Sequence, residues 1–63
     1  MAISLKAARV NAELTIDEAA IALEISKGTL VNYEKYRTTP DIVMAKKMAS
    51  LYNMSIDDII FFA

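Results

Sequence analysis

The chain has 63 residues, the size of one small domain, so we expect a single domain over residues 1–63. It contains no cysteine and no histidine, which excludes disulfide bonds, thiolate chemistry and most kinds of zinc site. Seven cationic and eight acidic side chains give a net charge of −1, whereas nucleic-acid-binding domains usually carry a positive excess. One glycine and one proline in the chain favour helices over sheets or disorder.

Neither a membrane span nor a secretion signal is expected. No apolar run approaches the ~20 residues that a transmembrane helix needs. The N-terminal segment "MAISLKAARVNAEL" carries charges early and holds no long apolar block, unlike a signal peptide. Together with the absence of cysteine, this favours a cytoplasmic location and no membrane partner.

Capping residues and the spacing of apolar side chains predict five short helices. The first is expected over residues 4–12, because its apolar residues recur every three to four positions. Thr15 and Glu18 form a T-x-x-E capping box, the strongest local start signal in the chain. This box opens a second helix that reaches about Leu23.

The second and third helices are separated by a very short connection. Ser26 can cap a third helix that ends near residue 35 or 36. Only Glu24 and Ile25 lie between the two, and so short a connection makes the helices cross steeply, as in a helix-turn-helix. Pro40 then ends the helical pattern, because it lacks a backbone N–H.

Two more helices are predicted after the proline. Asp41 is expected in the first turn of a fourth helix, where a carboxylate suits the helix dipole. Asn53 can end that helix in a left-handed conformation. Ser55 starts a last short helix over "SIDDIIFF", residues 55–62. The predicted fold class is therefore all-α and compact.

The order of these features is that of a known family. Two segments, "LTIDEAAIALEISKGTLVNYEKYRTTP" and "AKKMASLYNMSIDDII", contain the capping box, the two-residue turn, the "YE" near the end of the third helix and the following proline. Over residues 5–60 the chain resembles the Cro/CI-type (xenobiotic-response-element, XRE) helix-turn-helix DNA-binding family. The resemblance implies a five-helix bundle of the lambda-repressor-like type. It also implies a Cro-like transcriptional repressor that binds a palindromic double-stranded DNA operator as a homodimer.

The third helix is the element expected to read DNA. The major groove admits one α-helix, and the N-terminal residues of the second motif helix face the base edges. Lys27 can donate to guanine and Asn32 can pair with adenine, although both also suit a solvated helix face. Gly28 either allows close approach to the duplex or has no role. The expected base-contacting residues are Lys27, Gly28, Thr29 and Asn32.

Phosphate contacts are expected around both ends of the third helix. Residues 26–37 hold three cationic side chains against one acid, a local excess of +2 in a chain that is negative overall. Phosphate contacts position a protein on DNA without reading the base sequence. Exposed cations without a role are the alternative. With the resemblance, the expected backbone-contacting residues are Ser26, Lys35 and Arg37.

One pair of residues is assigned to architecture. In the family, an arginine of the first helix meets a glutamate near the end of the third. Arg9 and Glu34 occupy these positions, which implies a bidentate ion pair that fixes the third helix against the first.

Three positions depart from the family pattern. The family usually has glutamine where this chain has Ile16, and glycine with positive φ where it has Glu24. Val31 replaces a commonly polar residue. Ile16 and Val31 can touch thymine methyl groups, or they can belong to an apolar surface that meets another protein.

Phe61 and Phe62 are the candidate dimer interface. Adjacent residues of a helix point in different directions, so we expect a core this small to leave at least one of them uncovered. Inserting it into a second copy would form a homodimer seam. Folding of both rings back over the first helix is the alternative.

A second function class remains open. The acidic balance and the apolar surface residues also fit a protein-interaction module, similar to an antitoxin or anti-repressor, that keeps the fold with weak or no DNA binding. An enzyme is not expected, because the acidic pairs 17–18 and 57–58 are sequence neighbours whose side chains do not converge. No cofactor, metal or small-molecule substrate is expected.

Overall fold

A computed structural model of the chain describes residues 1–62. The described part contains four α-helices, one 3₁₀ turn and two short strands. In chain order these are β1 (Ile3–Ser4), α1 (Leu5–Asn11), α2 (Ile16–Leu23), α3 (Lys27–Glu34), α4 (Ile42–Leu51), η1 (Ile56–Asp58) and β2 (Ile59–Ile60). Within residues 1–62, no helix has the length and apolar character that spanning a membrane requires.

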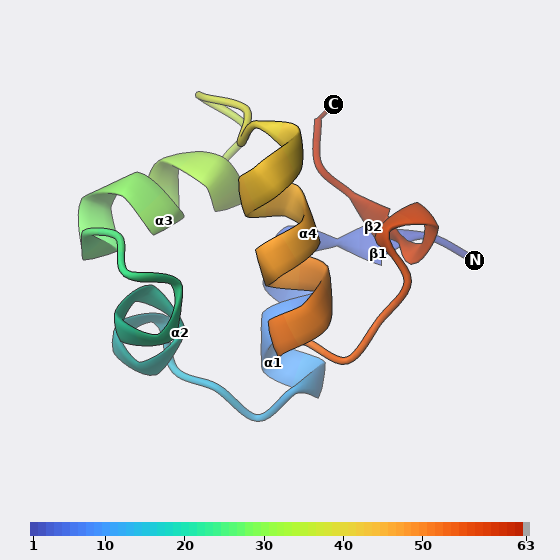
Figure 1. Cartoon of the computed structure of the whole chain (residues 1–63), viewed down its shortest axis with the longest axis horizontal. Coiled ribbons are helices and arrows are strands. Elements are labelled where there is room, and N and C mark those ends of the chain that lie inside the picture. The colour runs from blue at the N-terminus through green and yellow to red at the C-terminus, as the bar shows by residue number, and fades with distance from the viewer. Residues whose placement is uncertain (63) are drawn as a thin grey trace.

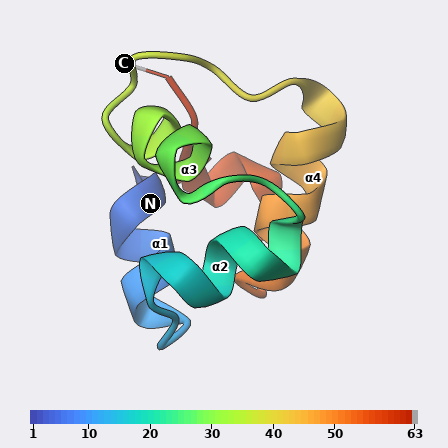
Figure 2. The same cartoon turned by 90° about the vertical axis from the view of Figure 1, so that its left-hand side faces the viewer.

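The helices pack around one small core. In Figure 1, α2 and α3 lie on the left, α4 in the middle and the two strands on the right. Figure 2 shows α3 lying above α2 and crossing it, the arrangement expected of a helix-turn-helix. The largest fully buried side chains are Leu5, Leu30 and Met48, one each from α1, α3 and α4. Small residues between them, among them Ala8, Ala19 and Ala49, let the helices approach closely.

The predicted starts of the first three helices are confirmed, and Ser55 caps the single turn η1. The side chains of Ser4, Thr15, Ser26 and Ser55 each accept a hydrogen bond from a backbone N–H of the turn that follows. In the capping box, the Thr15 hydroxyl accepts from the backbone N–H of Glu18 at 3.1 Å, and Oε1 of Glu18 accepts from the backbone N–H of Thr15 at 2.9 Å. Each bond satisfies a donor that the helix start would otherwise leave unpaired.

One start differs slightly from the prediction. Asp41 was expected within the first turn of α4, but it is the residue that caps the helix. Its side chain accepts a hydrogen bond from the backbone N–H of Met44 at 2.8 Å. The carboxylate therefore still lies at the positive end of the helix dipole.

All four α-helices end on a residue in the left-handed conformation. These residues are Glu13, Glu24, Tyr36 and Asn53, with φ between 56° and 60°. After α2, for example, the N–H of Glu24 donates to the carbonyl of Ile21 and the N–H of Ile25 to that of Ala20, both at 3.1 Å. This pair of bonds is the Schellman motif, which usually places glycine at the left-handed position. A Cβ there costs about 1 kcal/mol, and asparagine tolerates it best.

The predicted fifth helix over residues 55–62 is wrong. Only the single turn η1 forms, and the chain then becomes extended at Ile59–Ile60, which pairs in parallel with Ile3–Ser4. Adjacent β-branched residues favour an extended backbone. The Tyr36 hydroxyl supports this pairing, because it donates to the carbonyl of Ile60 at 2.8 Å and accepts from the N–H of Leu5 at 3.4 Å. The fold is mostly helical rather than all-α.

The left-handed residue between α2 and α3 gives the first testable prediction. Glu24→Gly removes the steric cost of a Cβ at φ 59° and should raise the free energy of unfolding by up to about 1 kcal/mol, measured by urea denaturation. Lys46→Gly is the matched control, because Lys46 is also exposed and charged but lies inside α4. Inside a helix, glycine should lower the free energy of unfolding by about 1 kcal/mol. Equal destabilisation by both changes would contradict the explanation.

Candidate nucleic-acid interface

The start of α3 is fixed by a short and well-defined turn. Glu24 takes the left-handed conformation expected at this position, with φ 59° and ψ 38°. Ile25 packs against the core, and Ser26 caps α3 with a hydrogen bond from the N–H of Thr29 at 3.1 Å. The turn therefore fixes both the end of α2 and the start of α3.

The predicted base-contacting residues lie on the side of α3 away from the core. Leu30 is fully buried, whereas Lys27 and Gly28 are exposed and Thr29 and Asn32 are half-buried. The Thr29 hydroxyl is already engaged, because it lies 2.8 Å from the Ser26 hydroxyl. The Asn32 side chain makes no such contact within residues 1–62, and Lys27 meets only one exposed acidic side chain, described below.

Gly28 is not required by the packing of the chain. A Cβ built at this position would meet no heavy atom within 4 Å. Its backbone is helical, so no left-handed conformation requires glycine either. A side chain at residue 28 would project into open space beside the other exposed residues of α3. If the lack of a side chain at residue 28 has a benefit, that benefit concerns a molecule that approaches this surface.

Lys27 has an acidic neighbour that sequence reasoning missed. Its Nζ lies 3.6 Å from Oδ1 of Asp17, in the first turn of α2, and both side chains are more than 60% exposed. Such a pair contributes under about 1 kcal/mol to stability. The residues are ten positions apart on different helices, so helix periodicity gives no signal for the contact. The steep crossing of α2 and α3 creates it.

Arg9 and Glu34 form a nearly buried ion pair. Nε of Arg9 lies 2.7 Å from Oε2 of Glu34, and Nη2 lies 3.3 Å from Oε1, which is a bidentate geometry. Nη1 donates to the carbonyl of Leu14 at 2.9 Å. The two side chains are 11% and 8% exposed. One guanidinium therefore links α1, α3 and the loop that leads to α2.

Tyr52 lies beside this pair. Its hydroxyl is buried and has no hydrogen-bond partner within residues 1–62. Burial raises the pKa of Tyr52 to about 12, and the negative charge of Glu34 adds to this rise. The tyrosine consequently stays neutral, and its ring fills the core below the ion pair.

The predicted backbone-contacting residues flank α3. Ser26 is exposed at the N-terminal end, but its hydroxyl is taken up by the helix cap. Lys35 and Arg37 follow the C-terminal end and are both exposed. The backbone N–H of Arg37 donates to the carbonyl of Asn32 at 3.0 Å, which holds the start of the following loop against the helix. Both cations of this set therefore lie at the C-terminal end of α3.

Two of the residues that depart from the family pattern, Ile16 and Val31, lie together. They line a hollow of about 310 Å³ at the junction of three helices. Its other lining residues are Lys6, Arg9, Glu34 and Lys35.

A second hollow adjoins the C-terminal phenylalanines. It measures about 340 Å³ and is lined by Thr39, Pro40, Ile42, Ala45, Ile56, Asp57, Phe61 and Phe62. Phe61 packs partly against the core, whereas Phe62 is 73% exposed. The alternative in which both rings are covered by the chain itself is therefore wrong. Ile42, which lines the same hollow, is also exposed, at 62%.

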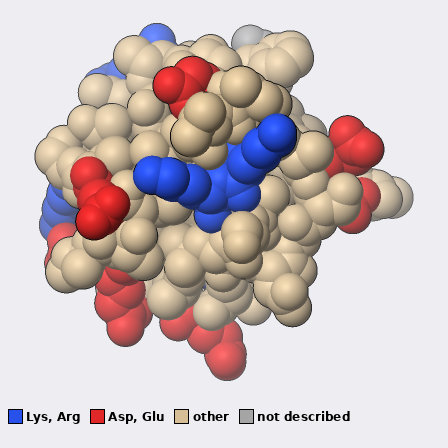
Figure 3. Space-filling view, in the orientation of Figure 1, with Lys and Arg blue, Asp and Glu red and all other residues tan. Residues whose placement is uncertain are grey.

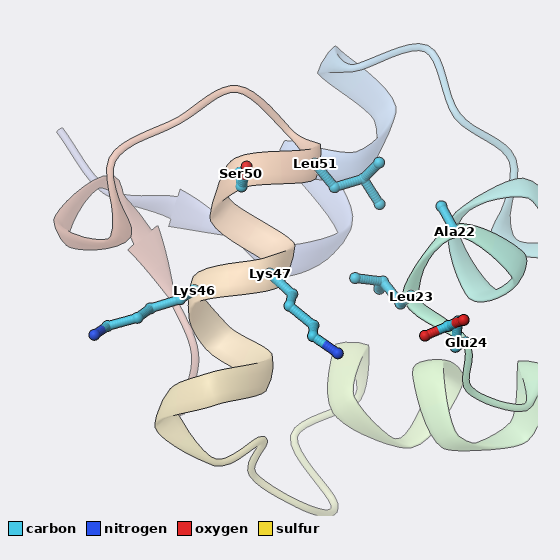
Figure 4. Close-up of a pocket in the computed structure, with 7 residues that line it drawn as sticks. All are labelled: Ala22, Leu23, Glu24, Lys46, Lys47, Ser50 and Leu51. Carbon is cyan, nitrogen blue, oxygen red and sulfur yellow. The ribbon is translucent and has the colours of Figure 1, made fainter.

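A third hollow, larger than these two, lies between α2 and α4. Figure 4 shows its lining, with Lys47 of α4 pointing toward Leu23 and Glu24 and Lys46 pointing away. It measures about 520 Å³. In Figure 3, cationic side chains gather over α4 in the middle of the face, with acidic side chains around them. None of the predicted DNA-contacting residues lines this hollow.

Comparison with known proteins identifies the family. The helix-turn-helix family model matches residues 5–59, which is most of the chain. The chain belongs to the XRE-type helix-turn-helix family of DNA-binding transcriptional regulators. The chain is 43% identical over 53 residues to the HTH-type transcriptional regulator ImmR of Bacillus subtilis (strain 168). The match covers 84% of this chain and 42% of ImmR. No solved structure gives a significant match.

Metal binding has no support in the described part of the chain. Across residues 1–62, no three acidic side chains are grouped so that they would hold an ion, and the sequence has neither histidine nor cysteine.

The buried ion pair gives the second prediction. Arg9→Ala leaves the Glu34 carboxylate nearly buried and unpaired, so the free energy of unfolding should fall by about 3–5 kcal/mol in urea denaturation. Lys27→Ala breaks the exposed pair with Asp17 and is the control, with an expected loss below about 1 kcal/mol. Similar losses for both variants would mean that Arg9 does not hold α3 in place.

Proposed function

We propose that this chain binds DNA sequence-specifically as a repressor similar to Cro, with α3 inserted into the major groove. Family membership supports DNA binding and transcriptional regulation. The observation that carries the finer proposal is the placement of α3. Its inner side is anchored by Leu30 and the Arg9–Glu34 pair, which leaves its N-terminal half free to meet a duplex.

The proposed base contacts come from the exposed side of α3. The Lys27 ammonium donates to guanine O6 and N7, and the Asn32 amide pairs with adenine N6 and N7. Gly28 lets the helix approach closely, since no other part of the chain occupies that space. Thr29 can also reach a base edge, with its hydroxyl still shared with Ser26.

The proposed backbone contacts come from both ends of α3. Lys35 and Arg37 bind phosphates beyond its C-terminal end, and Ser26 contacts the backbone at its start. These contacts fix the register of the helix in the groove and apply equally to every sequence. The cytoplasmic location expected from the sequence is part of this proposal, because the repressor has to reach its operator.

Two copies would act together on a palindromic site. Phe62 offers an exposed aromatic side chain, and the hollow beside it is lined with apolar residues that a second copy can fill. A homodimer with two-fold symmetry reads half-sites about one helical turn, ~34 Å, apart. Occupancy of the operator then blocks polymerase without any catalysis or cofactor.

A protein-interaction module is the second candidate, and specific observations favour it. The chain is acidic overall. Asp17 partly neutralises the charge of Lys27, the residue proposed to contact guanine. Ile21 is 78% exposed, which is unusual for a solvent-facing helix position. Titration with random duplex DNA at ~50 mM salt separates the two candidates. Affinity that falls steeply with salt supports the repressor, and absence of binding supports the interaction module.

Base preference gives the third prediction. Selection of bound sites from a random duplex library should return a palindrome, and Lys27→Ala and Asn32→Ala should each relax preference at their own base pair by about 1–3 kcal/mol. Arg37→Ala is the comparison, because loss of a phosphate contact weakens binding to all sequences alike and flattens the salt dependence. Unchanged specificity in both reading variants would refute the placement of α3 in the groove.

Gly28 gives the fourth prediction, in which stability and affinity change in opposite directions. Gly28→Ala should raise the free energy of unfolding by about 0.5–1 kcal/mol, because alanine favours the helix and meets no neighbour. The added methyl group should weaken operator binding, because it occupies the space of closest approach. Urea denaturation and duplex titration measure the two effects. A more stable variant with unchanged affinity would leave Gly28 without a role in binding.

A further inference from the structure

Tyr36, which follows the C-terminal cap of α3, takes a backbone conformation that disfavours bulky residues. Its φ is 59°, in the left-handed region where glycine is usual. A bulky residue in this region is an outlier, and such outliers persist where the surrounding structure holds them in place. The contacts of the Tyr36 side chain should therefore show what holds it there.

The Tyr36 hydroxyl joins segments that are distant in the sequence. It donates to the carbonyl of Ile60 at 2.8 Å and accepts from the backbone N–H of Leu5 at 3.4 Å, residues that lie 24 and 31 positions away. Leu5 begins α1, so its N–H has no carbonyl partner within the helix. Ile60 ends β2. One hydroxyl thus ties the end of α3 to the start of α1 and to the end of the C-terminal strand.

The backbone of Tyr36 lies within the cap that holds two proposed DNA contacts. The N–H of Tyr36 donates to the carbonyl of Tyr33 at 3.1 Å. The N–H of the next residue, Arg37, donates to the carbonyl of Asn32 at 3.0 Å. A displacement of Tyr36 would therefore move Arg37 and disturb the hydrogen bond to Asn32.

The other end of the link adjoins the C-terminal phenylalanines. The carbonyl that accepts from Tyr36 belongs to the peptide bond between Ile60 and Phe61. A contact made by Phe61 or Phe62 acts on this peptide directly. The hydrogen bond from Tyr36 therefore connects the candidate dimer contact with the candidate DNA contacts.

We propose that Tyr36 is a positioning residue that couples DNA binding by α3 to the C-terminal strand. Its hydroxyl holds the end of α3 in the orientation in which Asn32 and Arg37 reach a duplex. A duplex bound in that orientation stabilises the same hydrogen bond in return, because coupling between two sites is reciprocal. This inference rests on the proposed DNA-binding function and deepens it, since Tyr36 acts without touching DNA.

Amide hydrogen exchange tests the coupling. The duplex is the site selected from the random library, shortened to one half-site so that binding does not require two copies. At saturation it should slow exchange of the β1 and β2 amides in the unmodified chain, although these strands lie outside the proposed contact surface. Tyr36→Phe keeps the ring but lacks the hydroxyl, so the duplex should no longer slow this exchange.

Tyr33→Phe is the matched control. Tyr33 lies in α3, and like Tyr36 it is half-buried and packs against the core. The substitution removes the same atom without breaking the link to Ile60, so the slowing of exchange by the duplex should persist.

Affinity for the same half-site gives a second readout, at a temperature where denaturation curves show every variant to be folded. Tyr36→Phe should bind about two- to tenfold more weakly, because loss of a hydrogen bond of ordinary strength lowers the fraction of molecules with α3 in the binding orientation. Tyr33→Phe should bind like the unmodified chain. A purely structural role of the hydroxyl would lower stability but leave the affinity of the folded chain unchanged.

The outcomes separate the inference from the function on which it rests. If the unmodified chain binds the duplex without any change in β1 and β2 exchange, the coupling is overturned whatever the variants do, and the proposed function stands. Equal slowing of exchange and equal affinity in Tyr36→Phe overturn it as well. If the unmodified chain binds no duplex at any salt concentration, both fall.

Discussion

The placement of α3 depends on the bidentate pair between Arg9 and Glu34. Among the residues of α3, only Leu30 is fully buried. Hydrophobic burial alone therefore fixes this helix to the core through few side chains. The guanidinium adds two hydrogen bonds to the carboxylate and a third to the carbonyl of Leu14. Because the fork geometry is rigid, the pair also restricts rotation of α3 about its axis. That rotation decides which side chains face outward.

The chain combines a negative net charge with a locally positive surface. Salt screens charges over about 8 Å under physiological conditions, so a bound phosphate responds mainly to the side chains near it. Lys27 and Lys35 lie in α3 and at its C-terminal cap, and Lys6 lines the same hollow as Lys35, whereas Asp57 and Asp58 lie in η1. Asp17 lies close to Lys27, because the α2–α3 crossing brings the two side chains together. A total of −1 therefore does not describe the surface that would meet DNA.

Local signals in the sequence predicted most of the fold. Caps and apolar spacing located all four α-helices, because these patterns act within a single turn. The left-handed conformation at Glu24 and the partnership of Arg9 with Glu34 were both available only through the family resemblance. The C-terminal segment was mispredicted, since the extended Ile59–Ile60 depends on pairing with Ile3–Ser4, more than fifty residues away. No local pattern contains such a contact.

The sequence by itself determined the four α-helices, the helix-turn-helix and the family, because capping, turn geometry and amphipathic spacing are set by neighbouring residues. Tertiary structure decided which surfaces exist. The hollow that Lys6 and Lys35 share, the Asp17–Lys27 contact and the exposure of Phe62 next to a partly buried Phe61 all depend on how separate elements pack. Packing is a property of the whole core, and it assembles charge and shape from residues that are distant in the chain.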